Sequence, residues 1–300
     1  TDPLSLDYFN TIQTNCLWFQ PIHPTGGLGV ENDPATSAPY EPGSPYATKN
    51  FFAVNPWLGS ANTENSALSE FQTFVQKADD YAGSVGTINV MLDFVANHTA
   101  WDAVYGQGGV DLGFTGSGAN GIPVNWYSRT GDYGQAATYF TNLGDKDKAV
   151  APDRNDFGKW QDVAELYYGR YSAQWRFPSY TAGSEPHKNE DDFMDWNSLS
   201  PEVIQLWRYL GYYPIYWLQQ TGHSLSNSTS GSYAQRLAAD NKGIDSLRCD
   251  FGQGLPNPLW EYIINKTRSA KWNFVFMVET LDGEQPGYRY SRFANPTVAA

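Results

Sequence analysis

Short hydrophobic runs alternate with amphipathic segments along the chain. Four runs, at residues 15–20, 87–93, 243–250 and 273–279, predict β-strands. The segments at 4–13, 66–82 and 258–269 predict helices, and a fourth helix is expected to begin at Ser200-Pro201 with a polar cap and a first-turn proline. Pro214 should kink that helix or split it in two.

Alternating strands and helices predict a parallel α/β fold, and functional residues at strand ends favour a (β/α)8 barrel. The pattern supplies four barrel strands, whereas a closed barrel needs eight. We therefore expect an excised portion of a longer polypeptide, with one strand before Thr1 and three after Ala300. Residues 99–194 show no sustained period. The expected division is a first part of the barrel at 1–98, a large irregular insertion at 99–194, and a truncated continuation of the barrel at 195–300.

Composition excludes some classes of partner. The net charge of −13, without a run of Lys or Arg, argues against nucleic acid, and no apolar run is long enough to span a membrane. An aromatic content of 16% suits the flat faces of sugars, although most of these rings must belong to the core. Both cysteines, Cys16 and Cys249, lie in predicted strands, so buried free thiols are expected.

Two predicted strands end in carboxylates, and one of them also carries a cation. Arg248 and Asp250 are two residues apart, so they project from the same face of a strand. On this pair alone a structural ion pair is the favoured interpretation. Glu279 ends the next predicted strand and changes the balance. Two carboxylates on neighbouring strand ends suit a retaining glycosidase, which needs them about 5–5.5 Å apart.

Four short segments, taken in order, are similar to the motifs of one enzyme family. The chain resembles the α-amylase family, glycoside hydrolase family 13, over nearly its whole length. Each segment alone is a weak match, and the ordered set is the specific signal. The segments are Asp93-Phe94-Val95-Ala96-Asn97-His98, Asp195-Trp196-Asn197, Gly243 to Asp250, and Phe276-Met277-Val278-Glu279-Thr280.

The resemblance implies catalytic roles for the two strand-end carboxylates. Asp250 is expected to be the nucleophile that forms a covalent glycosyl-enzyme, and Glu279 the acid/base. Arg248, on the same strand face, should hold Asp250 ionised. Glu279 has no basic neighbour in its motif, so it is the expected site of a raised pKa.

The resemblance also implies a binding and supporting set. His98 is expected to hydrogen-bond the sugar beside the scissile bond, and Tyr46 to stack on the same sugar. Asp93 is expected to support Arg248, and Asn97 to be structural.

Two departures from the family pattern bear on activity. The fourth motif, a His-Asp pair that supplies a further catalytic Asp, is expected beyond Ala300. Typical α-amylases have a Lys-His pair after the nucleophile, and this chain has Phe251 to Pro256 there. No cofactor is expected for the chemistry. The missing Lys-His pair argues against the usual structural calcium and against plain α-amylase specificity. The metal content is therefore unknown.

Three interpretations follow. We favour a hydrolase or transglycosylase that acts on α-glucans or maltooligosaccharides, such as starch or glycogen. The alternative is a catalytically inactive barrel that binds carbohydrate or a partner protein, and the retained Asp250 and Glu279 argue against it. A barrel enzyme of phosphorylated metabolites fits the four motifs poorly. The expected partners are the glucan substrate and the remainder of the parent polypeptide. A secreted or periplasmic location is favoured over the cytoplasm.

Overall fold

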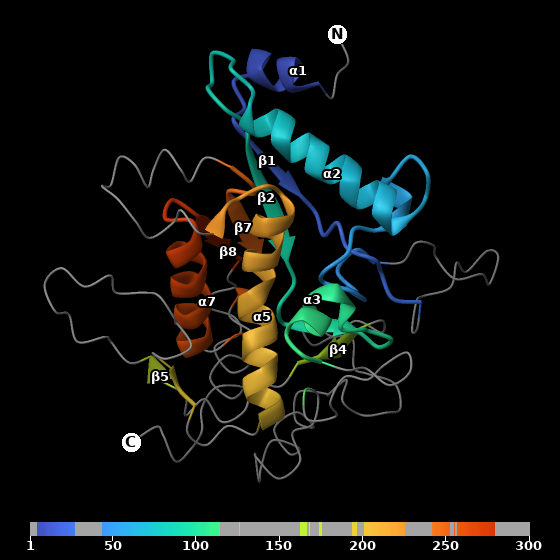
Figure 1. Cartoon of the computed structure of the whole chain (residues 1–300), viewed down its shortest axis with the longest axis vertical. Coiled ribbons are helices and arrows are strands. Elements are labelled where there is room, and N and C mark those ends of the chain that lie inside the picture. The colour runs from blue at the N-terminus through green and yellow to red at the C-terminus, as the bar shows by residue number, and fades with distance from the viewer. Residues whose placement is uncertain are drawn as a thin grey trace, which may run out of the picture.

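A four-stranded parallel sheet forms the centre of the computed structural model (Figure 1). The structure describes residues 5–27, 44–114, 126, 163–166, 168, 174–175, 194–196, 201–225, 242–252, 255 and 257–279. The strands, in sheet order, are β1 (Cys16–Phe19), β2 (Asn89–Phe94), β7 (Ser246–Cys249) and β8 (Val275–Val278). Every neighbouring pair is parallel, which confirms the α/β class and the four predicted strands. Within the described residues the sheet stays open, so the eight-stranded barrel remains a prediction.

The four predicted helices are also present. They are α1 (Leu6–Thr11), α2 (Glu64–Asp79), α5 (Pro201–Gln220) and α7 (Asn257–Ala270). Helix α5 continues through Pro214, so the expected split is wrong. Tyr213 and Trp217 flank this proline and are fully buried. Tertiary packing of these rings outweighs the single backbone hydrogen bond that the proline removes.

Side-chain alternation gives the sheet two different faces. Phe19 of β1 makes edge-to-face contacts with Phe71 and Phe74 of α2, and Phe94 of β2 stacks on Tyr213 of α5. These residues share the face that the helices cover (Figure 1). Residues one position along a strand must point to the opposite face. That face carries the polar strand-end residues.

Short elements occur within and beside the predicted insertion. Strand β3 (His98–Ala100) pairs antiparallel with β4 (Val163–Glu165), and β5 (Gln174–Trp175) with β6 (Met194–Asp195). A short helix, α3 (Gly106–Asp111), and a 3-10 turn, η1 (Pro56–Leu58), complete the described elements. Most of 99–194 lies outside the described residues, so the boundaries at 98 and 194 stay predictions.

The two cysteines differ in exposure. Both are free, as expected, and Cys249 is buried. Cys16 is exposed, so its predicted burial is wrong. It belongs to edge strand β1 and shares a face with Trp18, which is also exposed. In the part of the chain that is described, no helix has the length and apolar character needed to cross a membrane.

Candidate active site

Three adjacent strands deliver three carboxylates to one edge of the sheet. Asp93 lies in β2 directly opposite Arg248 of β7, while Asp250 and Glu279 follow the last residues of β7 and β8. The backbone of both following residues continues the ladder: Asp250 N donates to Phe94 O at 3.0 Å, and Glu279 N donates to Cys249 O at 3.0 Å. Parallel strands end at the same edge, so the register alone brings the three groups together.

Arg248 binds all three carboxylates through its two terminal nitrogens. Its Nη1 donates to both Asp93 oxygens at 3.1 Å and to Asp250 Oδ1 at 2.7 Å. Its Nη2 lies 2.9 Å from Glu279 Oε2. The predicted contacts of Arg248 with Asp93 and Asp250 are confirmed. The contact with Glu279 was not predicted: its own motif contains no basic residue, but β8 is aligned beside β7 and brings Glu279 to the second nitrogen of Arg248.

Aromatic rings line the guanidinium on the open side of the sheet. The Arg248 guanidinium carbon lies 5.3 Å from the ring centre of Trp18 and 5.9 Å from that of Tyr46. Trp18 Nε1 donates to Asp93 Oδ2 at 3.2 Å, and the Tyr46 hydroxyl approaches the same oxygen at 3.5 Å. Tyr46, the predicted stacking residue, therefore lies beside the carboxylates.

The carboxylates of Asp93 and Asp250 titrate well above their usual range. Burial is the largest cause for both, and it raises each pKa to about 6. Arg248 opposes this effect in both cases, and the neighbouring Glu279 carboxyl raises the pKa of Asp250 further. Arg248 favours the ionised form of Asp250, as expected, but one cation is shared among three carboxylates and does not offset the desolvation of Asp250, so the pKa stays at about 6.

One Asp250 oxygen is left for chemistry. Oδ1 is bound by Arg248, whereas Oδ2 is buried and receives no hydrogen bond from the described residues. A hydrogen bond between the Asp250 and Glu279 side chains would require a proton on one of the two carboxyls, because an ionised carboxylate can only accept. With both ionised, Oδ2 is an acceptor without a donor, which is costly in a buried site unless a reacting group or a proton occupies it.

Glu279 receives a second donor from a strained backbone. Phe251 N donates to Glu279 Oε2 at 3.1 Å. Phe251 follows Asp250 directly and has a positive φ of 47°, which is uncommon for a residue other than glycine. This turn lets the chain hold the Asp250 side chain and aim the next N–H at the Glu279 carboxylate.

His98 and Asn97 lie behind the Tyr46 loop. Both side chains are fully buried. His98 Nε2 lies 3.1 Å from Tyr46 O, and because a carbonyl only accepts, this nitrogen carries the proton. Its Nδ1 then accepts from Asn97 Nδ2 at 3.2 Å. In this arrangement His98 positions the backbone of Tyr46, and its ring is not exposed for the sugar contact that the family resemblance implied.

Sequence reasoning missed two residues near Asp93. Trp18 resembles a core aromatic in a hydrophobic strand. His23 is fully buried, with Nδ1 3.0 Å from Ala53 O and Nε2 2.8 Å from the Tyr213 hydroxyl, which in turn lies 3.3 Å from Asp93 O. Burial lowers the pKa of His23 to about 4, so the ring is neutral. A polar residue in the apolar segment after a strand end was the available signal.

Metal ligation has no candidate in the described part of the chain, where no group of three or more His, Cys, Asp or Glu side chains is arranged to hold an ion.

Comparisons with known proteins were made at the level of sequence and of structure. Neither known protein families nor curated proteins gave a match to the sequence. Among solved structures, the chain is similar to the ligand-free cyclic alpha-maltosyl-(1→6)-maltose hydrolase from Arthrobacter globiformis, with 14% identity, a TM-score of 0.45, and coverage of 91% of this chain and 40% of that one.

Two complexes of that hydrolase give similar figures. The complex with cyclic alpha-maltosyl-(1→6)-maltose has 13% identity, a TM-score of 0.45 and coverage of 91% and 39% of the two chains. The maltose complex has 14% identity, a TM-score of 0.43 and coverage of 91% and 40%. The chain thus spans about 40% of the length of these structures.

Proposed function

We propose that this chain carries the catalytic centre of a retaining enzyme that acts on α-glucans or maltooligosaccharides. The observation that supports the proposal is the binding of three strand-end carboxylates by Arg248. A buried structural ion pair is balanced when one carboxylate faces one cation. Three carboxylates on one guanidinium leave an excess of buried negative charge, and two of them match the pair that double-displacement chemistry requires.

The proposed first step uses Asp250 and Glu279 together. Asp250 Oδ2 attacks the anomeric carbon and forms an ester bond as the glycosidic C–O bond breaks. The electron pair of that bond stays on the leaving oxygen, which takes a proton from the Glu279 carboxyl. In the second step Glu279 removes a proton from the acceptor, whose oxygen displaces Asp250.

The required protonation state differs from that of two free carboxylates. The attack needs an ionised Asp250 and a protonated Glu279. The raised pKa of Asp250 keeps a proton in the site below about pH 6. We propose that this proton moves to Glu279 when substrate binds, which produces the reactive pair. Arg248 then pairs with the ionised Asp250 and Asp93.

The acceptor decides the product. Water gives hydrolysis, and a second sugar gives transglycosylation, while the chemistry at Asp250 is the same. Thin-layer chromatography of the products from maltooligosaccharides separates the two: chains longer than the substrate appear only when transfer occurs. The same separation, run with α-1,4- and α-1,6-linked substrates, identifies the linkage.

Substitution of the nucleophile tests the proposal. Asp250→Asn preserves size and packing and removes the nucleophile, so turnover of maltooligosaccharides should fall by roughly four orders of magnitude. Circular dichroism should show an unchanged fold. The matched control is Asp111→Asn, the same chemical change at the exposed end of α3, which should retain full activity.

Two outcomes would contradict the assignment. Retention of more than a tenth of the activity by Asp250→Asn would remove Asp250 as the nucleophile. Binding of maltooligosaccharides by the unsubstituted protein without any turnover would favour the alternative, a catalytically inactive carbohydrate-binding protein.

A further inference from the structure

Trp18 lies in β1, a strand that contributes no carboxylate to the charged cluster of Arg248, Asp93, Asp250 and Glu279. Its side chain nevertheless makes two contacts with that cluster. Its indole N–H donates to Asp93 Oδ2 at 3.2 Å, and its ring centre lies 5.3 Å from the guanidinium carbon of Arg248. One side chain therefore touches both members of the Asp93–Arg248 ion pair, whose nitrogen and oxygen lie 3.1 Å apart. The Trp18 side chain therefore bridges Asp93 and Arg248.

The position of Trp18 follows from strand register and alternation. Residue 18 pairs with Met91, two residues before Asp93 on the same face of β2. Its neighbours Leu17 and Phe19 pack toward the helices, so the indole must point to the opposite, open face. The side chain is 47% exposed, and so it is not held there by core packing. An exposed Trp whose N–H is directed at a buried carboxylate indicates a polar role.

The number of charges around Asp93 shows why an uncharged donor is useful there. Three carboxylates share one guanidinium, and Arg248 Nη1 already divides its donors between Asp93 and Asp250. Asp93 is completely buried, so each donor that it receives stabilises its ionised form. Trp18 supplies a donor that carries no charge and is not shared with Asp250 or Glu279.

We infer that Trp18 is a positioning residue, whose indole N–H holds Asp93 against Arg248 and leaves the other guanidinium donors to Asp250 and Glu279. The expected effect of Trp18 on turnover rests on the proposed function, whereas its expected effect on the ionisation of Asp93 does not. Trp18 acts through Asp93 and does not itself contact the reacting atoms.

Arg248 and Asp250 approach Asp93 from β7, the Tyr46 hydroxyl approaches it from its loop, and Tyr213 of α5 contacts the Asp93 backbone. Glu279, at the end of β8, binds the same guanidinium. Burial raises the pKa of Asp93 to about 6, and Arg248 and the Trp18 hydrogen bond both lower it. Loss of the Trp18 donor therefore shifts this titration upward.

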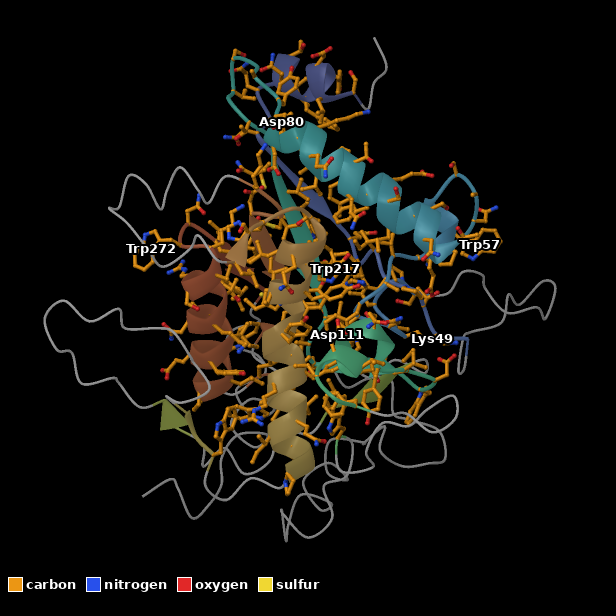
Figure 2. All side chains as sticks on the ribbon, viewed as in Figure 1. Lys49, Trp57, Asp80, Asp111, Trp217 and Trp272 are labelled. Carbon is orange, nitrogen blue, oxygen red and sulfur yellow. The ribbon has the colours of Figure 1, made fainter. Side chains whose placement is uncertain are left out.

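The experiment compares Trp18→Phe, which keeps an aromatic ring and removes the N–H, with Trp57→Phe. Trp57 lies at the periphery beside α2 (Figure 2) and is 69% exposed. Carboxyl ¹³C NMR titration, with Asp93→Asn for assignment, should show the pKa of Asp93 rising by about one unit in Trp18→Phe and unchanged in Trp57→Phe. An unchanged Asp93 titration in a folded Trp18→Phe protein would overturn the inference.

Kinetics supply a second, separate readout. With maltooligosaccharide substrates, Trp18→Phe should lower kcat about 10-fold and leave KM within about twofold. A raised KM with unchanged kcat would instead make Trp18 a substrate platform and overturn the positioning role. If the unsubstituted protein shows no turnover, the proposed function fails, and the Asp93 titration still decides the role of Trp18.

A further variant guards against a folding defect in Trp18→Phe. Asp93→Asn keeps Trp18 in place and removes the titrating group. The difference in fluorescence between the unsubstituted protein and Trp18→Phe should change with pH near 6, because a protonated carboxyl beside an indole alters its emission. The same pH dependence should be absent on the Asp93→Asn background, and its persistence there would contradict the contact.

Discussion

A single cation at the end of β7 sets the properties of the whole site. Arg248 lies within hydrogen-bonding distance of Asp93, Asp250 and Glu279, and all three cannot be ionised cheaply around one buried guanidinium. Burial, which this one guanidinium does not offset, raises the pKa values of Asp93 and Asp250 to about 6. A group that titrates close to the working pH is what acid/base and nucleophilic chemistry require.

The catalytic efficiency, kcat/KM, should depend on pH. The proposed reactive pair holds one proton, which Asp250 keeps below about pH 6, so kcat/KM should decrease about tenfold for each pH unit above about 6. The measurement is kcat/KM on a maltooligosaccharide between pH 4 and 8. Asp79→Asn is the control, since the pKa of Asp79 is also about 6 but its carboxylate binds Gly243 N before β7 begins. A wild-type profile that stays flat up to pH 8 would contradict the assignment.

At the scale of the elements, a buried lysine joins α7 to the start of β7. Lys271 is fully buried, and its Nζ donates to the carbonyls of Lys242, Gly243 and Ile244 at 3.0–3.2 Å and to Asp245 Oδ1 at 2.8 Å. Asp245 Oδ2 in turn accepts from Val90 N at 2.7 Å. These bonds fix the beginning of β7 beside β2, and so they set the register on which the site depends.

Removal of this cation should be costly. Lys271→Met keeps the length of the side chain but leaves a carboxylate and three carbonyls without their donor, so the free energy of unfolding should fall by about 3–5 kcal/mol. Urea denaturation measures it. Lys77→Met, at an exposed position of α2, is the matched control and should change stability by less than about 0.5 kcal/mol. A loss below about 1 kcal/mol in Lys271→Met would show that the contacts are not structural.

The sequence predicted the elements better than it predicted the contacts between them. Strand existence follows from local hydrophobic runs, and carboxylates at strand ends were expected to meet because parallel strands end at one edge. The contact between Arg248 and Glu279 depends on the alignment of β8 with β7, which no local pattern specifies. Trp18 was missed for a related reason: an aromatic residue in a strand is usually part of the core. Pro214 shows the reverse case, in which packing overrides a strong local signal.

At the scale of the whole molecule, several buried groups should make stability depend on pH. Burial raises the pKa of Asp79 to about 6, above its unfolded value near 3.8. Between these values the folded state binds more protons than the unfolded state, so this contribution is present below about pH 4 and is lost as the pH rises through 6. Asp93 and Asp250 act in the same direction. His23, whose pKa is lowered to about 4, acts in the opposite direction between pH 6.5 and 4.

Asp79→Asn isolates one of these contributions. The amide oxygen still accepts from Gly243 N, and no charge is buried at neutral pH. The variant should therefore be more stable than the wild type by about 1–2 kcal/mol at pH 7.5 and equal to it near pH 4. Urea denaturation at the two pH values measures this. A difference that is the same at both values would contradict the raised pKa.

Direct trapping tests whether Asp250 forms a covalent bond with the sugar. A 5-fluoro-α-glucosyl fluoride carries a good leaving group and slows both steps, so a retaining enzyme accumulates the glycosyl ester. After digestion with a protease, mass spectrometry should find one added fluoroglucosyl group on the peptide that contains Asp250, and none in Asp250→Asn. A label on Glu279 or on another residue, or turnover of the reagent with inverted configuration and no labelled peptide, would contradict the account.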